Sequence, residues 1–393
     1  MKTLIELYDE RPLENVLGVE MFRPERVVYI CPKAVASDPR TKRQLRAYFE
    51  HRGLSPKLQL MQVDVYDAEA VLQRLREILA RDPDCAIDIT GGTDAVLFAA
   101  GLLSAEARVP VFTYSRRQNR FYDIRNAPFA AELACDVRYS VEDCFRMAGG
   151  VMRSGRVDHD ALGSYMPDIE PFFRLYMAHR REWIKIVNFL QRVSQTVPEG
   201  PIPLEVRGAY EVKGERGSRI QAPEAALRDL EEIGFLQDLR IEPEERVSFR
   251  FRDQQIRAWL RDVGSVLELY VYKTCVDLEL FDDVRISAVV DWEANMKANA
   301  VSNELDVMCT RGVTPVFISC KTCDVKTEAL NELAILRDRF GGQMAKAAIV
   351  TAERGSTVMR NRAGELNIRV IDLSDLQAGR AKERIRALMR AER

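Results

Sequence analysis

Short segments in the first third of the chain alternate with longer segments of helical periodicity. Four segments are rich in β-branched and aromatic residues and predict strands: RVVYIC (26–31), KLQLMQVD (57–64), CAIDIT (85–90) and VPVFTYS (109–115). Between them, apolar residues three to four positions apart predict helices near 39–52, 67–81 and 93–105. Strands that alternate with helices in this way predict a doubly wound, Rossmann-like parallel sheet.

The last third of the chain reads as a second α/β unit. Apolar residues recur at helical spacing from Gln255 to Leu280. Strands are predicted at 284–290, around 304–308, and at 316–321, 345–352 and 367–373. Helices are predicted from Thr327 to Arg339, where Gly341 and Gly342 follow as a stop signal, and from Ser356 onward. This order predicts a small central sheet with helices around it.

The middle of the chain predicts helices and a β-ribbon. A long helical pattern covers 168–193 and is broken by a cluster of prolines and glycine (Pro198, Gly200, Pro201 and Pro203). A second helix ends at Gly234, and a strand is predicted at 244–252. This combination suggests a winged-helix-like unit. Its candidate recognition helix, AALRDLEEI, is acidic and unsuited to phosphate contact, so we expect a connector that also supports a dimer.

The predicted division is therefore 1–150, 151–250 and 251–393, which is consistent with a chain of 393 residues. The net charge of −2 indicates no global affinity for nucleic acid, so any such surface must be local. Eight cysteines without even spacing suggest reduced thiols. The N-terminus carries acids where a signal peptide needs an apolar run, and no segment has membrane length. We expect a cytoplasmic protein without a membrane partner.

The segment from Asn303 to Cys323 predicts a β-hairpin with its turn at 310–312. Asp306 on one strand and Lys321 at the end of the other can meet at one end of a sheet. A carboxylate can hold Mg²⁺ or Mn²⁺ and an ammonium group favours a phosphate, which is the chemistry of metal-dependent nucleases. The alternative is a solvated Asp and Lys on an amphipathic edge. The apolar Phe317 and Ile318 favour a site, because they bury the strand that delivers Lys321.

Cysteines and histidines offer no competing site. Cys320 and Cys323 form a CxxC pair, but a structural zinc needs a second pair and a redox pair normally opens a helix. We therefore interpret Cys320 as a buried apolar residue. The three histidines, His51, His159 and His179, are scattered along the chain.

A second motif follows the predicted strand at 85–90. Thr90, Gly91, Gly92 and Thr93 precede an Ala-rich helix, where glycine amides and a helix N-terminus suit an anion. No Walker lysine follows, which disfavours ATP hydrolysis. The alternative is a tight turn with Thr93 as the N-cap. Lys33 follows the strand at 26–31 on the same sheet edge, and Asn119 lies in the run YSRRQNRFYDI, whose arginines are otherwise typical of a solvated hairpin tip.

From Phe251 onward the chain resembles the restriction-endonuclease-like PD-(D/E)xK fold. The resemblance matches Glu268 to the helical acid of that family, Asp306 to the strand acid and Lys321 to the lysine. Ser319 stands where the family usually has a second acid. Some family members with Ser at this position carry the acid on the following helix, which here implies Glu328 or Glu332.

Taken with the TGGT turn, the whole chain resembles the CARF-domain effectors of type III CRISPR systems, and most of all the ancillary nucleases with one CARF and one PD-(D/E)xK domain. The motifs that carry this resemblance are DITGGTDAVLFAAG, NELDV, VFISCKT and ELAILRDRFGG. It implies a homodimer that binds one cyclic oligoadenylate, by family usage the tetra-adenylate, and then nicks DNA or cuts single-stranded DNA or RNA with little sequence preference.

The same resemblance implies the site residues. The activator would contact Lys33, the turn from Thr90 to Thr93, and Asn119. Mg²⁺ or Mn²⁺ would bind Glu268, Asp306 and the carbonyl oxygen of Cys320. Two alternatives stay open: a ligand-responsive transcription regulator with an inactive nuclease-like domain, and a ring nuclease that degrades its own activator. Retention of Glu268, Asp306 and Lys321 together disfavours the first, and the absence of an obvious nucleophile or base at the TGGT turn disfavours the second.

Overall fold

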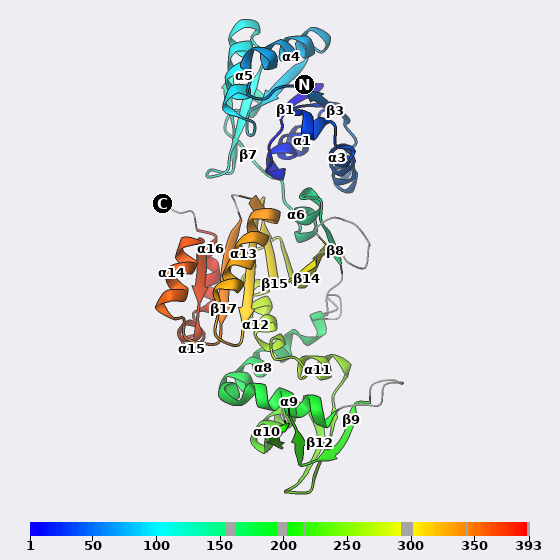
Figure 1. Ribbon diagram of the computed structural model, residues 1–393, viewed down its shortest axis with the longest axis vertical. Helices are drawn as coiled ribbons and strands as arrows, with labels where there is room; N and C mark the ends of the chain where they lie inside the picture. Colours follow the sequence, from blue (N-terminus) through cyan, green and yellow to red (C-terminus); the bar gives the residue numbers. More distant parts are fainter. Residues whose placement is uncertain (154–161, 195–202, 215–216, 292–301, 343–344, 391–393) are drawn as a thin grey trace.

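The computed structural model describes residues 1–153, 162–194, 203–214, 217–291, 302–342 and 345–390. Three parts follow one another along its long axis (Figure 1): the N-terminal domain, the C-terminal domain, and a helix–sheet unit built from residues 162–251. The sequence suggested that the last part connects the other two. Instead it lies at the far end of the molecule, and the C-terminal domain packs directly against the N-terminal one. Within the described ranges, no helix is long and apolar enough to cross a membrane.

The N-terminal domain contains a seven-stranded sheet in the order β3-β2-β1-β4-β5-β6-β7. The strands are β1 (Thr3–Leu7), β2 (Arg26–Cys31), β3 (Lys57–Gln62), β4 (Cys85–Asp88), β5 (Val111–Ser115), β6 (Arg120–Arg125) and β7 (Leu133–Ala134). The first five are parallel and the last two pair antiparallel, which confirms the Rossmann-like prediction. The pattern analysis missed β1, the middle one of the five parallel strands. All five of its residues are buried, so it shows no polar alternation.

Helices cover the sheet as the periodicity predicted. The elements are η1 (Pro12–Asn15), α1 (Leu17–Phe22), α2 (Lys33–Ala36), α3 (Pro39–His51), α4 (Ala68–Arg81), α5 (Asp94–Ala107), η2 (Pro128–Ala130) and α6 (Val141–Met147). Helices α3, α4 and α5 coincide with the three predicted ones. Asp38 and Asp67 cap α3 and α4 by accepting hydrogen bonds from first-turn amides, which explains why these helices start where they do.

The C-terminal domain contains a six-stranded sheet in the order β18-β17-β16-β15-β14-β8. Its strands are β8 (Val151–Arg153), β14 (Asp283–Asp291), β15 (Ser302–Arg311), β16 (Thr314–Lys321), β17 (Lys346–Thr351) and β18 (Ile368–Ile371). Its helices are α11 (Gln254–Trp259), α12 (Ser265–Val276), α13 (Thr327–Gly341), α14 (Thr357–Glu365), α15 (Leu373–Gln377) and α16 (Ala381–Leu388). The edge strand β8 comes from just after the N-terminal domain, so the chain enters this sheet before it forms the helix–sheet unit.

Both faces of the central hairpin β15–β16 are buried. Met308 and Phe317 belong to a core shared with the N-terminal domain. Val307 and Ile318, which point the other way, belong to a core shared with the helix–sheet unit. The hairpin is therefore held between the two other parts of the molecule.

Two predicted long helices are each interrupted. The pattern from Gln255 to Leu280 divides into α11 and α12, because Gly264 stands at the α12 N-cap position and Asp262 accepts a hydrogen bond from the Ser265 amide at 3.1 Å. The pattern at 168–193 divides into α8 (Met166–His179) and α9 (Trp183–Val193), joined by the 3₁₀ turn η4 (Arg180–Glu182). Periodicity continued through both breaks, so it could not reveal them.

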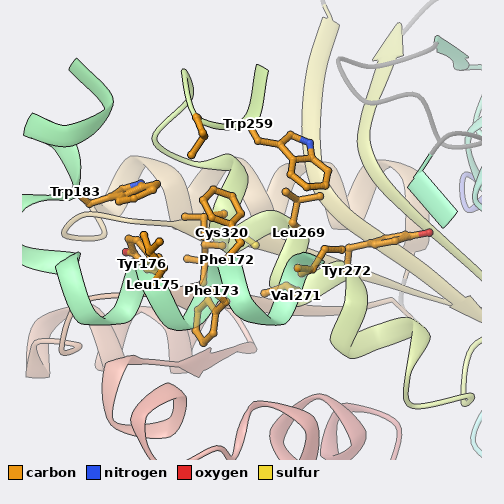
Figure 2. Packing of buried hydrophobic residues seen from close by; sticks show 14 of the residues in the cluster. Phe172, Phe173, Leu175, Tyr176, Trp183, Trp259, Leu269, Val271, Tyr272 and Cys320 are labelled. Atoms are coloured by element: carbon orange, nitrogen blue, oxygen red, sulfur yellow. The ribbon is translucent and has the colours of Figure 1, made fainter. Parts of the chain in front are cut away.

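The helix–sheet unit has the helices and ribbons expected of a winged-helix-like unit. Besides α8 and α9 it contains η3 (Gly163–Tyr165), α10 (Glu224–Glu232), the sheet β12-β13-β9 (Leu236–Glu242, Arg246–Phe251, Glu205–Ala209) and the ribbon β10-β11 (Glu211–Lys213, Arg219–Gln221). Figure 2 shows its aromatic core, in which Phe172, Trp183 and Trp259 pack toward α12. Cys320 is buried in this cluster, as predicted. The predicted break at Pro198, Gly200 and Pro201 lies outside the described residues.

A row of polar side chains crosses the core of the N-terminal sheet. Tyr29, Glu6 and Asp88 lie opposite one another on β2, β1 and β4, and all three are buried. Burial raises the pKa of both carboxyl groups, and the charge of Asp88 raises that of Glu6 further. Gly18 of α1 lies directly over the pair: a Cβ there would lie 2.9 Å from Glu6 Oε1 and still closer to Asp88 Oδ2.

We expect Gly18→Ala to lower the free energy of unfolding by about 1–3 kcal/mol, because the added methyl group would push into a buried carboxyl pair. Gly101→Ala is the matched control: Gly101 also lies in a helix but has nothing within 4 Å of its would-be Cβ. That control should raise stability by about 0.5–1 kcal/mol through helix propensity. Urea denaturation followed by circular dichroism measures both. Equal effects of the two substitutions would contradict the packing we describe.

Candidate active site and anion-binding turn

Asp306 is the residue on which the donors of the C-terminal site converge. The β15–β16 hairpin brings it opposite the end of β16, where Oδ2 accepts a hydrogen bond from the Cys320 amide at 2.6 Å and from the Ser319 hydroxyl at 3.0 Å. Lys321 Nζ lies 3.6 Å from the same oxygen. In the described part of the chain no donor reaches Oδ1. One carboxylate oxygen therefore orients the side chain and the other is available to a ligand.

Glu268 approaches Asp306 from another element, the first turn of α12. Burial raises the pKa of Glu268 to about 8, and repulsion from Asp306, Asp262 and Glu304 adds to the shift. No hydrogen bond to this carboxyl group comes from the described residues. Burial likewise raises the pKa of Asp306, although Lys321 and the two hydrogen bonds oppose the change. Two adjacent carboxyl groups are thus held where their charge is disfavoured.

Lys321 supplies the positive charge of the site. Burial is the largest single influence and acts to lower the pKa of its ammonium group, but the charges of Asp306, Cys320 and Glu268 and the hydrogen bond to Asp306 together raise the pKa above its ordinary value. Lys321 is therefore protonated at neutral pH. In that form it donates hydrogen bonds and attracts anions, and it does not act as a base.

The acids that the resemblance implied on the following helix lie to one side. Glu328 and Glu332 are both exposed on α13, and Glu332 accepts a hydrogen bond from the Asn303 amide group at 2.8 Å. The acids whose charges raise the pKa of Glu268 are Asp306, Asp262 and Glu304. Sequence reasoning missed Asp262. Asp262 lies two residues before Gly264 and three residues before Ser265, the first residue of α12. An acid just before the start of this helix is the signal that could have revealed it.

The carboxyl pair fits a hard divalent cation in its donor chemistry. Among the described residues no donor reaches Glu268 or the Oδ1 atom of Asp306, and a cation between the two carboxyl groups would offset the burial and repulsion that raise their pKa values. The described residues contain no group of three or more His, Cys, Asp or Glu side chains that could hold a metal ion.

The TGGT turn lies at the carboxyl end of β4, as predicted, but its side chains are largely occupied. Asp88 Oδ1 accepts hydrogen bonds from the Thr90 amide, at 2.8 Å, and from the Thr90 hydroxyl. The hydroxyl oxygen of Thr90 in turn accepts a hydrogen bond from the Tyr114 amide at 2.9 Å. The hydroxyl of Thr93 donates to the carbonyl oxygen of Val65 at 2.5 Å. Thr93 is at the N-cap position of α5, yet its side chain makes no capping bond. The turn therefore offers few side-chain donors, and the amides of Thr90 and Gly92 also donate within the domain.

The two glycines are needed by packing within the domain. Gly92 has φ +97°, and a Cβ there would lie 2.8 Å from Leu7 Cβ. A Cβ at Gly91 would lie 2.9 Å from the carbonyl oxygen of Leu7. The Gly92 amide donates to Asp9 Oδ2 at 3.2 Å. The missed strand β1 is thus the element that shapes this turn.

Lys33 and Asn119 lie at the same sheet edge, but Lys33 is exposed whereas the side chain of Asn119 is hydrogen-bonded within the domain. Lys33 is exposed at the start of α2, directly after β2. Asn119 closes the β5–β6 hairpin: its Oδ1 accepts from the Tyr114 hydroxyl at 2.7 Å, and its Nδ2 donates to the carbonyl oxygen of Cys135 at 3.2 Å. The histidines form no site among the described residues. His51 pairs with Asp143 and His179 with Asp229, and His159 lies outside those residues.

Comparison with known proteins places this geometry in context. Residues 255–391 match the family described as the Card1-like endonuclease domain. The whole chain shares its fold with Can2 from Sulfobacillus thermosulfidooxidans, solved in complex with cyclic tetra-adenylate, at a TM-score of 0.70 and 16% identity over 99% of both chains. The chain also shares this fold with protein VC1899 from Vibrio cholerae, at a TM-score of 0.73 and 16% identity over 99% of both chains. No curated protein matches the chain.

The raised pKa of Glu268 predicts a pH-dependent stability. Its ordinary value is 4.5 and its value in the fold is about 8, so the folded state favours the neutral form, and this contribution is lost as the pH rises between those values. In EDTA, Glu268→Gln should become more stable relative to wild type between pH 5 and pH 9, by roughly 2–4 kcal/mol. Thermal and urea unfolding at several pH values measure this. Glu328→Gln, at an exposed site, is the control. Parallel stability curves for wild type and Glu268→Gln would refute the buried carboxyl pair.

Proposed function

We propose that this chain is a metal-dependent nuclease of type III CRISPR defence that a cyclic oligoadenylate switches on. The observation that carries the proposal is the convergence of Glu268, Asp306 and Lys321, from α12, β15 and β16, within a segment that matches an endonuclease-domain family. The fold shared with Can2, which was solved with cyclic tetra-adenylate, supports a nucleotide ligand of that kind.

Each residue of the site has a role in hydrolysis of a phosphodiester. Glu268 and the free oxygen of Asp306 would hold Mg²⁺ or Mn²⁺, with the carbonyl oxygen of Cys320 as a further ligand. A bound cation of this kind supplies Lewis acidity toward the phosphate and lowers the pKa of a coordinated water. Lys321 would stabilise the charge that develops on the phosphate oxygens and orient the attacking water. Ser319 holds Asp306 in place through its 3.0 Å hydrogen bond. Glu332 remains the candidate for an additional acid.

Substrate choice follows from what contacts the nucleic acid. Glu268, Asp306 and Lys321 would act on a phosphodiester, which is common to DNA and RNA, and none of these three residues would read a base. We therefore propose nicking of double-stranded DNA and cleavage of single-stranded DNA or RNA with weak sequence preference. The acidic α10 (Glu224–Glu232), with one arginine against four acids, does not favour a regulator that reads DNA through the helix–sheet unit.

The activator would bind at the carboxyl edge of the N-terminal sheet. The amides at the start of α5 and the exposed Lys33 suit phosphates, whereas Thr90, Gly91, Gly92 and Asn119 would shape the surface through their bonds and packing. A cyclic tetra-adenylate has a twofold axis, so a twofold dimer can hold it with identical contacts from each protomer.

A homodimer is supported by an apolar face on α5. Phe98 and Leu102 are four residues apart on this helix and are 62% and 37% exposed, directly beyond the TGGT turn. Two such side chains on one face, on a helix that is apolar nearly all round, suit burial against a second copy of the chain.

Asp306→Ala and Lys321→Ala should each lower the rate of plasmid and RNA cleavage by at least about 100-fold, because each removes a group that acts on the phosphate or its metal. The assay uses Mn²⁺ and each cyclic oligoadenylate in turn. Asp324→Asn, an exposed acid just beyond β16, should leave the rate unchanged. Undiminished cleavage by folded Asp306→Ala, or by wild type in excess EDTA, would overturn the assignment.

Phe98→Glu combined with Leu102→Glu should convert a dimer into a monomer, because two charges cannot be buried unpaired at an apolar interface. Light scattering after size-exclusion chromatography measures the mass. Ile335→Glu, at an apolar residue of α13 that is 56% exposed, is the matched control and should remain dimeric. A double variant that keeps the dimer mass would show that the α5 face is not the interface.

A further inference from the structure

A large groove separates the N-terminal and C-terminal domains on one side of the molecule. Its volume is about 1160 Å³, and its lining residues come from the β5–β6 hairpin in one domain and from the β15–β16 turn, β17 and the end of α16 in the other. Pockets for small molecules usually measure about 300–1000 Å³. The groove therefore suits a ligand larger than a single nucleotide.

The groove is strongly cationic although the chain carries a net charge of −2. Six basic side chains line it (Arg116, Arg117, Arg138, Arg311, Lys346 and Arg390), against only Asp136 and Asp282. Arg116 pairs with Glu14, and Arg138 pairs with Asp282 at 3.0 Å. Arg117, Arg311 and Arg390 are exposed, and none has an ion pair with any described residue. Such a concentration of positive charge between low-dielectric walls attracts a polyanion.

The groove adjoins the activator edge and lies away from the catalytic groups. Tyr114 lines it, and the Tyr114 amide is bonded to Thr90 of the TGGT turn. On the other side, Arg311 is five residues along β15 from Asp306, and Thr314 is seven residues along β16 from Lys321. Extended strands rise by about 3.3 Å per residue, so the catalytic groups are roughly 16–23 Å away. This placement favours an activator over the nucleic acid that is cut.

We infer that the C-terminal domain contributes directly to the activator site: Arg311 and Arg390 contact the phosphates of the cyclic oligoadenylate from the face opposite Arg117. This inference rests on the proposed function, because it names further residues for the same ligand. It assigns the activator to both domains, so the ligand bridges them.

A bridging ligand explains how a distant catalytic centre can respond. The β15–β16 turn in the groove is already fastened to the N-terminal domain, since the Tyr139 amide donates to the carbonyl oxygen of Gly312 at 3.0 Å. The Gly312 amide donates to Asp282, the partner of Arg138. A ligand shifts an equilibrium only through contacts that differ between two states. A ligand can contact Arg117 and Arg311 at the same time only in some relative positions of the two domains. Strands β15 and β16 connect the groove to Asp306 and Lys321, so a change in domain position can reach these residues.

The test is the affinity of the full-length protein for fluorescent cyclic tetra-adenylate, measured by anisotropy in EDTA so that cleavage plays no part. Arg311→Ala and Arg390→Ala should each weaken binding about tenfold or more, as expected for loss of a charged hydrogen bond, and Arg117→Ala should do the same. Lys382→Ala is the matched control: it is an exposed cation on α16 that does not line the groove, and its affinity should equal that of wild type.

Two outcomes would overturn the inference while leaving the proposed function intact. In one, wild type binds the ring and Arg311→Ala and Arg390→Ala bind it equally well, so the site belongs to the N-terminal domain alone. In the other, these variants keep their affinity for the ring but lose affinity for labelled single-stranded DNA or RNA, so the groove holds substrate. If wild type binds no cyclic tri-, tetra- or hexa-adenylate at all, the proposed activation fails as well.

Discussion

Burial of the β15–β16 hairpin on both faces is the constraint on which the rest of the structure depends. One face packs into the core shared with the N-terminal domain and the other into the core shared with the helix–sheet unit. A shift of register by one residue would exchange the two faces, so packing permits a single register. That register places Asp306 opposite Ser319 and beside Lys321. The same hairpin carries Gly312 to the N-terminal domain, so one element links the two domains.

Both candidate sites contain pairs of carboxyl groups that are buried away from solvent. Near α12, no donor from the described residues reaches Glu268 or the Oδ1 atom of Asp306, and burial raises the pKa of both carboxyl groups. In the N-terminal sheet, burial also raises the pKa of Glu6 and Asp88, but Asp88 is satisfied by Thr90 and lies beneath the turn. In each pair one carboxyl group is hydrogen-bonded, Asp306 or Asp88, whereas Glu268 and the Oε1 atom of Glu6 have no hydrogen-bond partner among the described residues.

Much of this was predictable because strong local patterns coincide with the real elements. The hairpin, the strands of the Rossmann-like sheet, and α3, α4, α5 and α13 all appear close to their predicted bounds. The failures have a common cause. Strand β1 has no polar alternation because it is buried on both faces, and the breaks before α9 and α12 lie inside continuous helical periodicity. In each case a long-range environment overrode the local signal.

Residue types and their order determined which chemistry this protein can perform: a strand acid, a lysine two positions after Ser319, and a glycine turn between a strand and a helix. Only the tertiary structure decided which of these groups are available. Hydrogen bonds within the domain occupy the side chains of Thr90, Thr93 and Asn119. Packing against Leu7 requires glycine at positions 91 and 92. Asp262, which sequence reasoning missed, lies close enough to Glu268 to raise its pKa. The groove brings together Arg117, Arg311 and Arg390, which are far apart in the sequence. Hydrogen bonds and cavities depend on distances between elements, and a local sequence pattern contains no such distances.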